Sequence, residues 1–252
     1  MALPARPRTL GSAMDAPLAM PKLVGEPDPD GWVTETLAYR VTARPKPKFH
    51  SVVSLAHALA GAPGRATVTT RTRAPERDAR VLELEARIEL GTASLVDQFS
   101  CVWRDGLCAG KLTRTAGNAR RKEIDFLESP FPLPAATYPE VLLPFLLRGQ
   151  PLDGARRALY AWTSDRFVAR VYYESRAEHR LDVPAGRFDT TALWMYPDLN
   201  DWISLGSVVT RLAKPLLPRY EMWLETAAPH RLVRFEGAYG PPGAPEIVIE
   251  LA

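Results

Sequence analysis

Two acidic residues occupy positions from which they could carry out acid–base chemistry. Glu35 lies at an alternate position to Val33 and Leu37, so in a β-strand the three side chains would share one face. Asp97 shares the parity of Phe99, so β-strands would turn both carboxylates toward an apolar face. Such a carboxylate must be paired, hydrogen-bonded or protonated, because an isolated buried charge is too costly. Each could be a general acid or base with a raised pKa. We favour a structural interpretation, in which each ties down a strand or pairs with an internal arginine.

His179 is the third candidate for catalysis, because it alone among the four histidines lies on a clearly apolar strand face. None of the four has the H-x-E or H-E-x-x-H spacing of a metal site. We interpret His179 as a satisfied core or lumen histidine, with an acid–base or ligand-binding role as the alternative. We expect no metal and no cofactor, since nucleophile motifs and glycine-rich phosphate loops are also lacking.

Aromatic side chains are numerous, with six tryptophans and eight tyrosines. In a tightly closed barrel the inward ones form the core, and in a wide barrel they line an apolar pocket with polar tips. A barrel of more than about eight strands has room for a cavity, which favours ligand binding. The predicted ligand-binding residues are Tyr39, Trp103, Tyr173, His179, Trp194, Tyr196 and Tyr220.

The two cysteines flank a predicted hairpin turn at Asp105–Gly106. A two-residue turn makes Trp103 face Cys108 and makes Cys101 face Gly110, so the cysteines share a face diagonally. A disulfide needs closer and better oriented partners, and a reducing compartment disfavours it. We therefore expect two packed thiols, with a disulfide or a metal or redox site as alternatives.

Alternating polarity predicts the elements that position these residues. The clearest run is Phe167–Leu181, where apolar and charged residues alternate as in a long, half-buried strand. Pro184 and Gly186 suit a tight turn after it, and 188–196 would complete a hairpin. Similar runs predict strands over 33–41, 81–90, 95–103, 219–225 and 246–251. We expect a mainly β chain, a curved antiparallel sheet or barrel of roughly ten to twelve strands.

Helical signals are few, and we expect two or three short helices. The range 137–149 opens on a threonine and closes on a glycine, and it is apolar nearly all round. Such a helix should be buried, plugging one side of the sheet, and Pro144 should break or kink it. The other two helices are expected over 49–61 and 197–218.

Composition indicates a globular protein, with 46% hydrophobic and 24% charged residues among 252. The net charge of +3 comes from 32 basic and 29 acidic residues of interleaved sign, which argues against nucleic-acid binding. The 24 prolines and 16 glycines indicate many turns and few long helices.

The range 1–30 is rich in Pro, Ala and Gly without a period, and we expect a disordered or loosely docked tail. A single domain is expected over 31–252. No secretory signal or apolar run long enough to span a bilayer is visible. We therefore expect a cytoplasmic protein that could contact membranes transiently, or a periplasmic one if the chain is trimmed. The sequence leaves its oligomeric state open.

Several short motifs resemble an uncharacterised bacterial family, the domain-of-unknown-function 3108 family. They are V-P-A-G-x-F-D-T from Val183, E-x-L-x-Y-x-V from Glu35 and D-x-F-x-C-x-W from Asp97. The resemblance covers roughly residues 33–252. It implies an antiparallel sheet curved into a half or full barrel, similar to lipoprotein-carrier folds that hold acyl chains in a concave face. It supplies no catalytic residues.

Three functional hypotheses follow. The first is binding or carriage of a hydrophobic or amphipathic, lipid-like small molecule in the concave face, without catalysis. The second is an isomerase, cyclase or hydrolase that uses Glu35 or Asp97 together with His179 or a tyrosine. The third is a structural or partner-binding module with outward apolar residues such as Trp223 and Leu232.

Overall fold

The protein folds mostly into β-strands, as a computed structural model shows. The described residues are 14–15, 18–44, 63–104, 107–117, 122–125, 137–164, 167–198, 220–238 and 246–252. The expected mainly β class, a curved and nearly closed barrel, is confirmed. The helices expected over 49–61 and 197–218 lie outside the described residues, apart from Pro197 and Asp198. No helix in the described ranges is long and apolar enough to cross a membrane.

One sheet contains fourteen strands from the described part of the chain. In chain order they are β1 (Met14–Asp15), β2 (Trp32–Arg44), β3 (Pro63–Glu76), β4 (Ala79–Leu90), β5 (Ala93–Arg104), β6 (Leu107–Ala116), β7 (Lys122–Asp125), β8 (Thr137–Pro139), β9 (Arg157–Ser164), β10 (Phe167–Val183), β11 (Gly186–Pro197), β12 (Tyr220–Glu225), β13 (Leu232–Ala238) and β14 (Glu246–Leu251).

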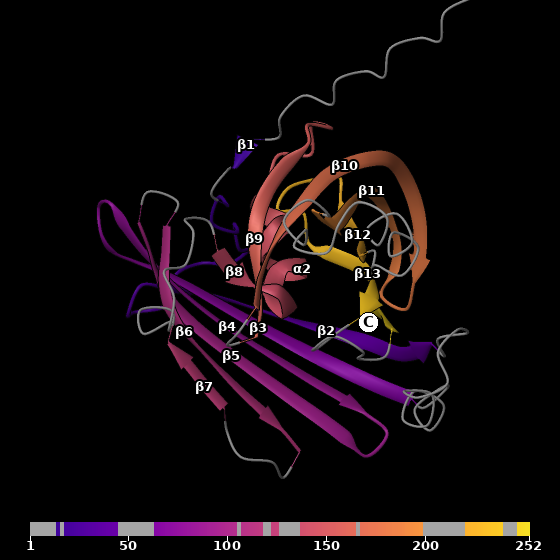
Figure 1. Ribbon diagram of the computed structural model, residues 1–252, viewed down its shortest axis with the longest axis horizontal. Helices are drawn as coiled ribbons and strands as arrows, with labels where there is room; N and C mark the ends of the chain where they lie inside the picture. Colours follow the sequence, from indigo (N-terminus) through magenta and orange to yellow (C-terminus); the bar gives the residue numbers. More distant parts are fainter. Residues whose placement is uncertain are drawn as a thin grey trace, which may run out of the picture.

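The sheet is built from two antiparallel runs that meet at β2. Strands β2 to β7 are successive neighbours, and β9 to β14 are successive neighbours. Strand β14 then pairs antiparallel with β2, from Glu246 opposite Arg44 to Leu251 opposite Tyr39. Figure 1 shows the first run as a broad layer of long strands and the second run curling over it. The last strand of the chain thus joins the two runs.

Among the described residues, side-chain contacts rather than a ladder of backbone hydrogen bonds close the barrel where the two runs approach on the other side. The strand order ends at β1 and β7, and the short β8 pairs parallel with β9 while also contacting β6. Across this seam the rings of Trp103 and Tyr138 stack, with centroids 5.6 Å apart. The backbone N–H of Leu18 donates to the Tyr138 hydroxyl at 2.9 Å. Leu18 is buried, so this part of the expected tail packs against the seam.

A short irregular helical segment fills the space inside the curve (Figure 1). It consists of η2 (Glu140–Leu142), α2 (Leu143–Leu146) and η3 (Leu147–Gly149), and we call Glu140–Gly149 the plug. Its residues Val141–Arg148 are all buried. The predicted buried segment at 137–149 is therefore present, but only four residues form α-helix. Pro144 lies in the first turn of α2, where a proline without an N–H is tolerated.

Inward side chains from both runs pack around the plug as one apolar core. The largest fully buried side chains are Tyr39, Tyr138, Tyr173, Phe99, Phe235, Leu18, Leu82, Leu84, Leu112, Leu142, Leu143 and Leu146. Tyr39 and Phe145 lie 6.2 Å apart between ring centroids, which ties β2 to the plug. Their low exposure shows that these side chains pack against one another and the plug rather than against solvent.

The β10–β11 hairpin forms as predicted, but its inward face differs from the prediction. Val183 pairs with Gly186, whose φ is 131°, around a two-residue turn, in the region that glycine favours. A bulge interrupts the ladder, since Ser175 faces Leu193 while Glu178 faces Thr191. Residues 176–180, around and beyond the bulge, are all exposed, so the buried face of β10 ends at Ser175.

Candidate functional site

The buried end of the plug forms an ion pair with the barrel wall. Arg148 in η3 donates through both terminal nitrogens to the Glu35 carboxylate in β2, and one of these bonds, Nη2 to Oε1, is 3.2 Å long. Its Nε donates to the backbone carbonyl of Pro229 at 3.3 Å. The side chains are 4% and 8% exposed. Glu35 thus pairs with an internal arginine, which is the structural role that we favoured.

The Tyr39 hydroxyl lies near this ion pair and has no hydrogen-bond partner among the described residues. Burial raises the pKa of Tyr39 well above its ordinary value, and the charge of Arg148 opposes this only in part. A buried hydroxyl without a partner is costly. This corner of the core could therefore accept one further hydrogen bond from a small polar group.

The other end of the plug carries a carboxylate. Glu140 in η2 accepts a hydrogen bond of 2.5 Å from the Tyr220 hydroxyl in β12. Burial raises the pKa of Glu140, while the Tyr220 hydrogen bond and the Arg114 charge act in the opposite direction. Burial and the nearby carboxylate of Glu140 also raise the pKa of Tyr220. This pair can hold a proton that a surface glutamate would release.

Asp97 lies beside this second polar group, as the partner of Arg114. Asp97 in β5 is fully buried, and Arg114 in β6 donates to both of its oxygens, at 2.7 and 3.0 Å. The two residues face each other across the strands. Arg114 is 21% exposed, and it is the link between Asp97 and the Glu140 carboxylate. Asp97, like Glu35, has the favoured structural role.

No contact joins His179 to Glu35 or Asp97 within the described ranges, and a catalytic role for the three stays a prediction. His179 lies beyond the bulge in β10 and is exposed, whereas Glu35 and Asp97 are buried in ion pairs. The predicted inward placement of His179 in the core or lumen is therefore wrong.

The seven predicted ligand-binding residues fall into two groups. Tyr39, Trp103, Tyr173 and Tyr220 are buried in the core. Three others face outward, against the prediction: His179, Trp194 and Tyr196. Strand β11 carries apolar residues on both faces, and its inward side is that of Leu193 and Met195, so parity alone misassigned the face. Binding of a ligand by any of the seven stays a prediction.

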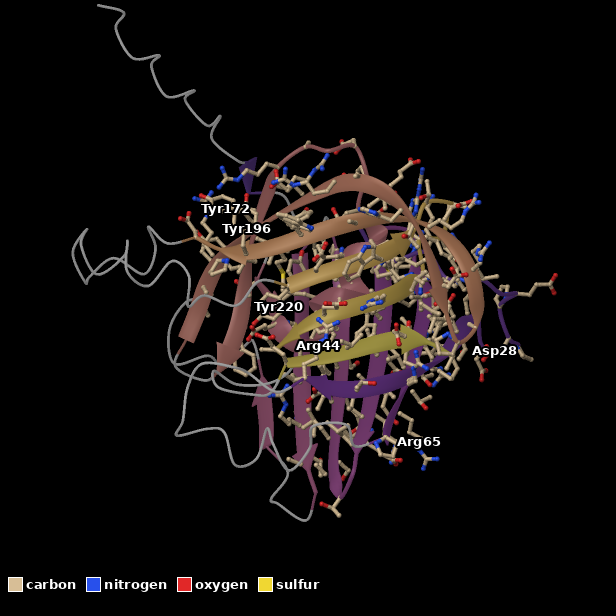
Figure 2. All side chains as sticks on the ribbon, turned by 90° about the vertical axis from the view of Figure 1, so that its right-hand side faces the viewer. Asp28, Arg44, Arg65, Tyr172, Tyr196 and Tyr220 are labelled. Carbon is tan, nitrogen blue, oxygen red and sulfur yellow. The ribbon has the colours of Figure 1, made fainter. Side chains whose placement is uncertain are left out.

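Arginines and carboxylates cover the outward aromatic residues. Figure 2 shows Tyr172 and Tyr196 together on the hairpin, 5.8 Å apart between centroids. The guanidinium of Arg156 lies 3.8 Å from the Tyr172 ring centroid, a favourable cation–π contact. The Trp194 indole donates to Glu221 at 2.9 Å. These residues form a stabilised outer surface.

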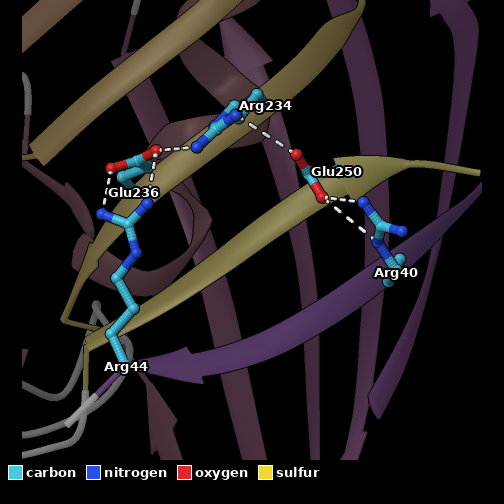
Figure 3. Close-up of polar contacts among 5 residues, drawn as sticks. All are labelled: Arg40, Arg44, Arg234, Glu236 and Glu250. Carbon is cyan, nitrogen blue, oxygen red and sulfur yellow. Dashed lines mark hydrogen bonds and ion pairs between the residues drawn. The ribbon is translucent and has the colours of Figure 1, made fainter. Parts of the chain in front are cut away.

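A second outer network crosses three strands of the barrel. Its members, which alternate in charge, are Arg40, Glu250, Arg234, Glu236 and Arg44 (Figure 3). Arg40 lies 2.5 Å from Glu250, and Arg44 lies 2.7 Å from Glu236. Because each charge faces an opposite one, this network supports strand pairing. The outward apolar surface expected at Leu232 is wrong, since that residue is buried.

The cysteine hairpin has the predicted register. Trp103 faces Cys108, and Cys101 faces Gly110. A Cβ added at Gly110 would lie 2.4 Å from the Cys101 Cβ, so this close packing requires a glycine. Within the described ranges no group of three potential ligands could hold a metal ion.

Four polar residues of the interior escaped the sequence prediction: Arg114, Glu140, Arg148 and Gln150. Arg148 and Glu35 lie 113 positions apart, and Glu140 and Tyr220 lie 80 apart. No local pattern links such partners. The single available signal was the presence of charged residues at both ends of the apolar run 141–147.

Comparison with known proteins yields distant structural neighbours and no family. No family model matches the sequence, and no curated protein matches it. A β-barrel-like protein of domain of unknown function 1849 from Brucella abortus has 8% identity and a TM-score of 0.44, over 94% of this chain and 98% of that one. A candidate exported protein with a YmcC-like fold from Bacteroides fragilis has 12% identity and a TM-score of 0.34, over 92% and 97%. The resemblance to the 3108 family is not supported by these comparisons.

Proposed function

We propose that the barrel binds and carries an amphipathic small molecule with an anionic head, in the space that the plug occupies. The observation that carries the proposal is the chemistry of the plug itself. It is a continuous apolar stretch, Val141–Leu147, with the carboxylate of Glu140 at one end. An amphiphile with a hydrocarbon chain and a carboxylate would present the same groups to the same wall.

The wall would receive both parts of such a ligand. The apolar residues around the plug would bury the chain, which favours binding by roughly 25 cal/mol per Å² of apolar surface removed from water. The Tyr220 hydroxyl and the Arg114 guanidinium would receive the head in place of Glu140. Hydrogen bonds to a charged oxygen are the strong ones in such a site.

Two features support displacement of the plug. Its α-helical part is four residues long, and so short a helix has little stability of its own. The seam beside β8 has side-chain contacts such as Trp103 on Tyr138, and in the described part of the chain no backbone ladder pairs β6 with β8. A ligand could enter by that route while the rest of the sheet stays paired.

Binding of dodecanoate tests this proposal, with dodecanol as the uncharged probe. We expect dodecanoate to bind to the wild-type protein and to raise its Tm. In Glu140→Ala the competing carboxylate is gone, so dodecanoate should bind about tenfold more tightly, a gain of about 1.4 kcal/mol. The affinity for the uncharged dodecanol should change far less on the same substitution. Glu236→Ala, on the outer network, is the matched control and should leave both affinities within about twofold.

Two results would contradict the proposal. One is the absence of saturable dodecanoate binding to both the wild type and Glu140→Ala. The other is an equal gain in Glu236→Ala, which would indicate a non-specific effect of charge. Native mass spectrometry after gentle purification adds an independent readout, because a carried amphiphile should leave with the protein.

A second candidate function is acid–base catalysis at the Glu140–Tyr220 pair, favoured by the raised pKa of Glu140. A carboxyl that holds its proton more tightly than a surface glutamate could serve as the proton donor in isomerisation, cyclisation or hydrolysis of a bound amphiphile. Chemical comparison of the molecule before and after incubation distinguishes the two candidates, since a carrier returns it unchanged.

A further inference from the structure

A hollow of about 450 Å³ lies on the outer face of strands β3 to β6, away from the plug. Eight outward side chains surround it, and Leu84 and Phe99 reach it only from below, since both are about 2% exposed. The outward residues are Thr69, Arg71, Glu83, Glu85, Gln98, Ser100, Lys111 and Thr113.

Strand register arranges these eight side chains as a grid of two rows. Pairing of successive strands aligns Arg71, Glu83, Ser100 and Lys111 in one row, and Thr69, Glu85, Gln98 and Thr113 in the other. Four strands at ordinary spacing span about 14 Å, and the rows lie about 7 Å apart. The hollow exists because Ser100 and the threonines are short, whereas the charged side chains around them are long.

Neighbouring residues hold the planar groups of the grid in place. The Arg71 guanidinium lies over the Trp32 ring at 4.5 Å and 3.5 Å from Glu83. Stacking on the Trp32 ring occupies the flat face of the Arg71 guanidinium and leaves the N–H donors at the edge of that guanidinium available. On the other row, Gln98 donates to Glu85 at 2.7 Å. The grid thus presents oriented donors and acceptors side by side.

We propose that this hollow binds a saccharide. Two basic and two acidic residues line it, so their charges balance and favour a neutral polar ligand over an ion. Carboxylate, guanidinium and amide groups each offer two adjacent polar atoms, which suit the neighbouring hydroxyls of a sugar. Among the described residues that line the hollow, no outward side chain is apolar, which disfavours a hydrophobic ligand. The span of about 14 Å accommodates more than one sugar ring.

Titration calorimetry with maltose, cellobiose and N-acetylglucosamine tests the proposal, with free arginine, a net cation at neutral pH, as the charged probe. We expect saturable binding of at least one saccharide to the wild type. Ser100→Phe fills the hollow and should weaken that binding by at least about tenfold, or 1.4 kcal/mol. Val102→Phe is the matched control, because Val102 is two residues along the same strand, is 44% exposed and lies outside the hollow.

Circular dichroism should show that both variants fold, and loss of binding in Ser100→Phe alone would then support the site. Gln98→Ala should weaken binding without filling space. The proposal is overturned if no saccharide binds to the wild type, if only arginine binds, or if Ser100→Phe and Val102→Phe bind alike. The outward side chains of the hollow lie on the other face of the sheet from the plug, so saccharide binding and dodecanoate binding are measured separately.

Discussion

At the scale of single residues, Glu140 is the group whose protonation should most affect the fold. Burial disfavours its charged form, while Tyr220 and Arg114 favour that form. The net effect is a raised pKa, so the folded protein holds this proton at a pH where the unfolded chain has lost it. Protonation of one carboxyl at the end of the plug is thus coupled to folding.

The pH dependence of stability tests this coupling. Because the folded pKa of Glu140 is raised, its contribution is complete below the ordinary glutamate range and falls as pH rises through the raised pKa. The Glu140→Gln variant has no carboxyl at this position, so it does not lose stability in this way as pH rises. Its free energy of unfolding relative to the wild type should therefore increase from about pH 4 to about pH 7 in urea titrations.

Asp153 provides an internal control, because the shift of its pKa is opposite in direction to that of Glu140. Hydrogen bonding to Arg157 lowers the pKa of Asp153 well below its ordinary value, so its contribution is present at higher pH and is lost as pH falls. Asp153→Asn should therefore lose stability relative to the wild type as pH rises. A parallel pH profile of Glu140→Gln and wild type would contradict the assignment.

The same residues show how far sequence reasoning reaches at this scale. Parity identified Glu35 and Asp97 as inward carboxylates, because a strand alternates faces. It could not identify Arg148, since that arginine comes from a helical segment far along the chain. Which side chains meet inside a barrel depends on how the sheet closes, and no local stretch of the sequence specifies that closure.

At the scale of elements, the plug depends on its ion pair with β2. Arg148 and Glu35 are almost completely buried, so removing either partner leaves an uncompensated charge. The pair orients the end of the plug, while its apolar residues supply the burial. The plug is therefore fixed in place by charge and stabilised by packing.

A double-mutant cycle measures this contribution. Glu35→Leu and Arg148→Met should each lower the free energy of unfolding by roughly 3–5 kcal/mol, and the double variant should recover much of that loss. The exposed Arg65–Glu89 pair, with side chains 78% and 37% exposed, is the control, and its coupling should stay below about 1 kcal/mol. Additive losses at the buried pair would contradict the proposed role.

Strand faces were predictable where one side of a strand is apolar, and not elsewhere. Strand β4 alternates cleanly, and Leu82 and Leu84 are buried as expected. Strand β11 carries Trp194 on one face and Met195 on the other, so both phases were plausible from the sequence. In β10 the bulge at Ser175 shifts the register by one residue, and no glycine or proline marks it.

At the scale of the whole molecule, strand β14 is the join between the two runs of the sheet. It is the one link between β13 and β2 in the observed strand order. Its inward residues Ile247, Ile249 and Leu251 are buried. The hairpin turn also reaches this strand, since the Ala185 N–H donates to the Leu251 carbonyl at 3.0 Å. The plug is enclosed only because this join curves the sheet around it.

Removal of residues 246–252 should therefore abolish the cooperative fold. Three large buried side chains contribute roughly 1.5–3 kcal/mol each, which together approach the 5–15 kcal/mol that typically stabilises a domain. The truncated chain should lose its thermal transition in circular dichroism, and the peptide EIVIELA added in trans should restore it saturably.

A peptide with Ile249→Lys should fail, because Ile249 is fully buried. A peptide with Glu250→Gln should succeed, since residue 250 is on the outer face, where an amide can replace the carboxylate at the cost of a partly exposed ion pair. A truncated chain that keeps its transition would mean that each run is stable alone, and the enclosed space would then not depend on β14.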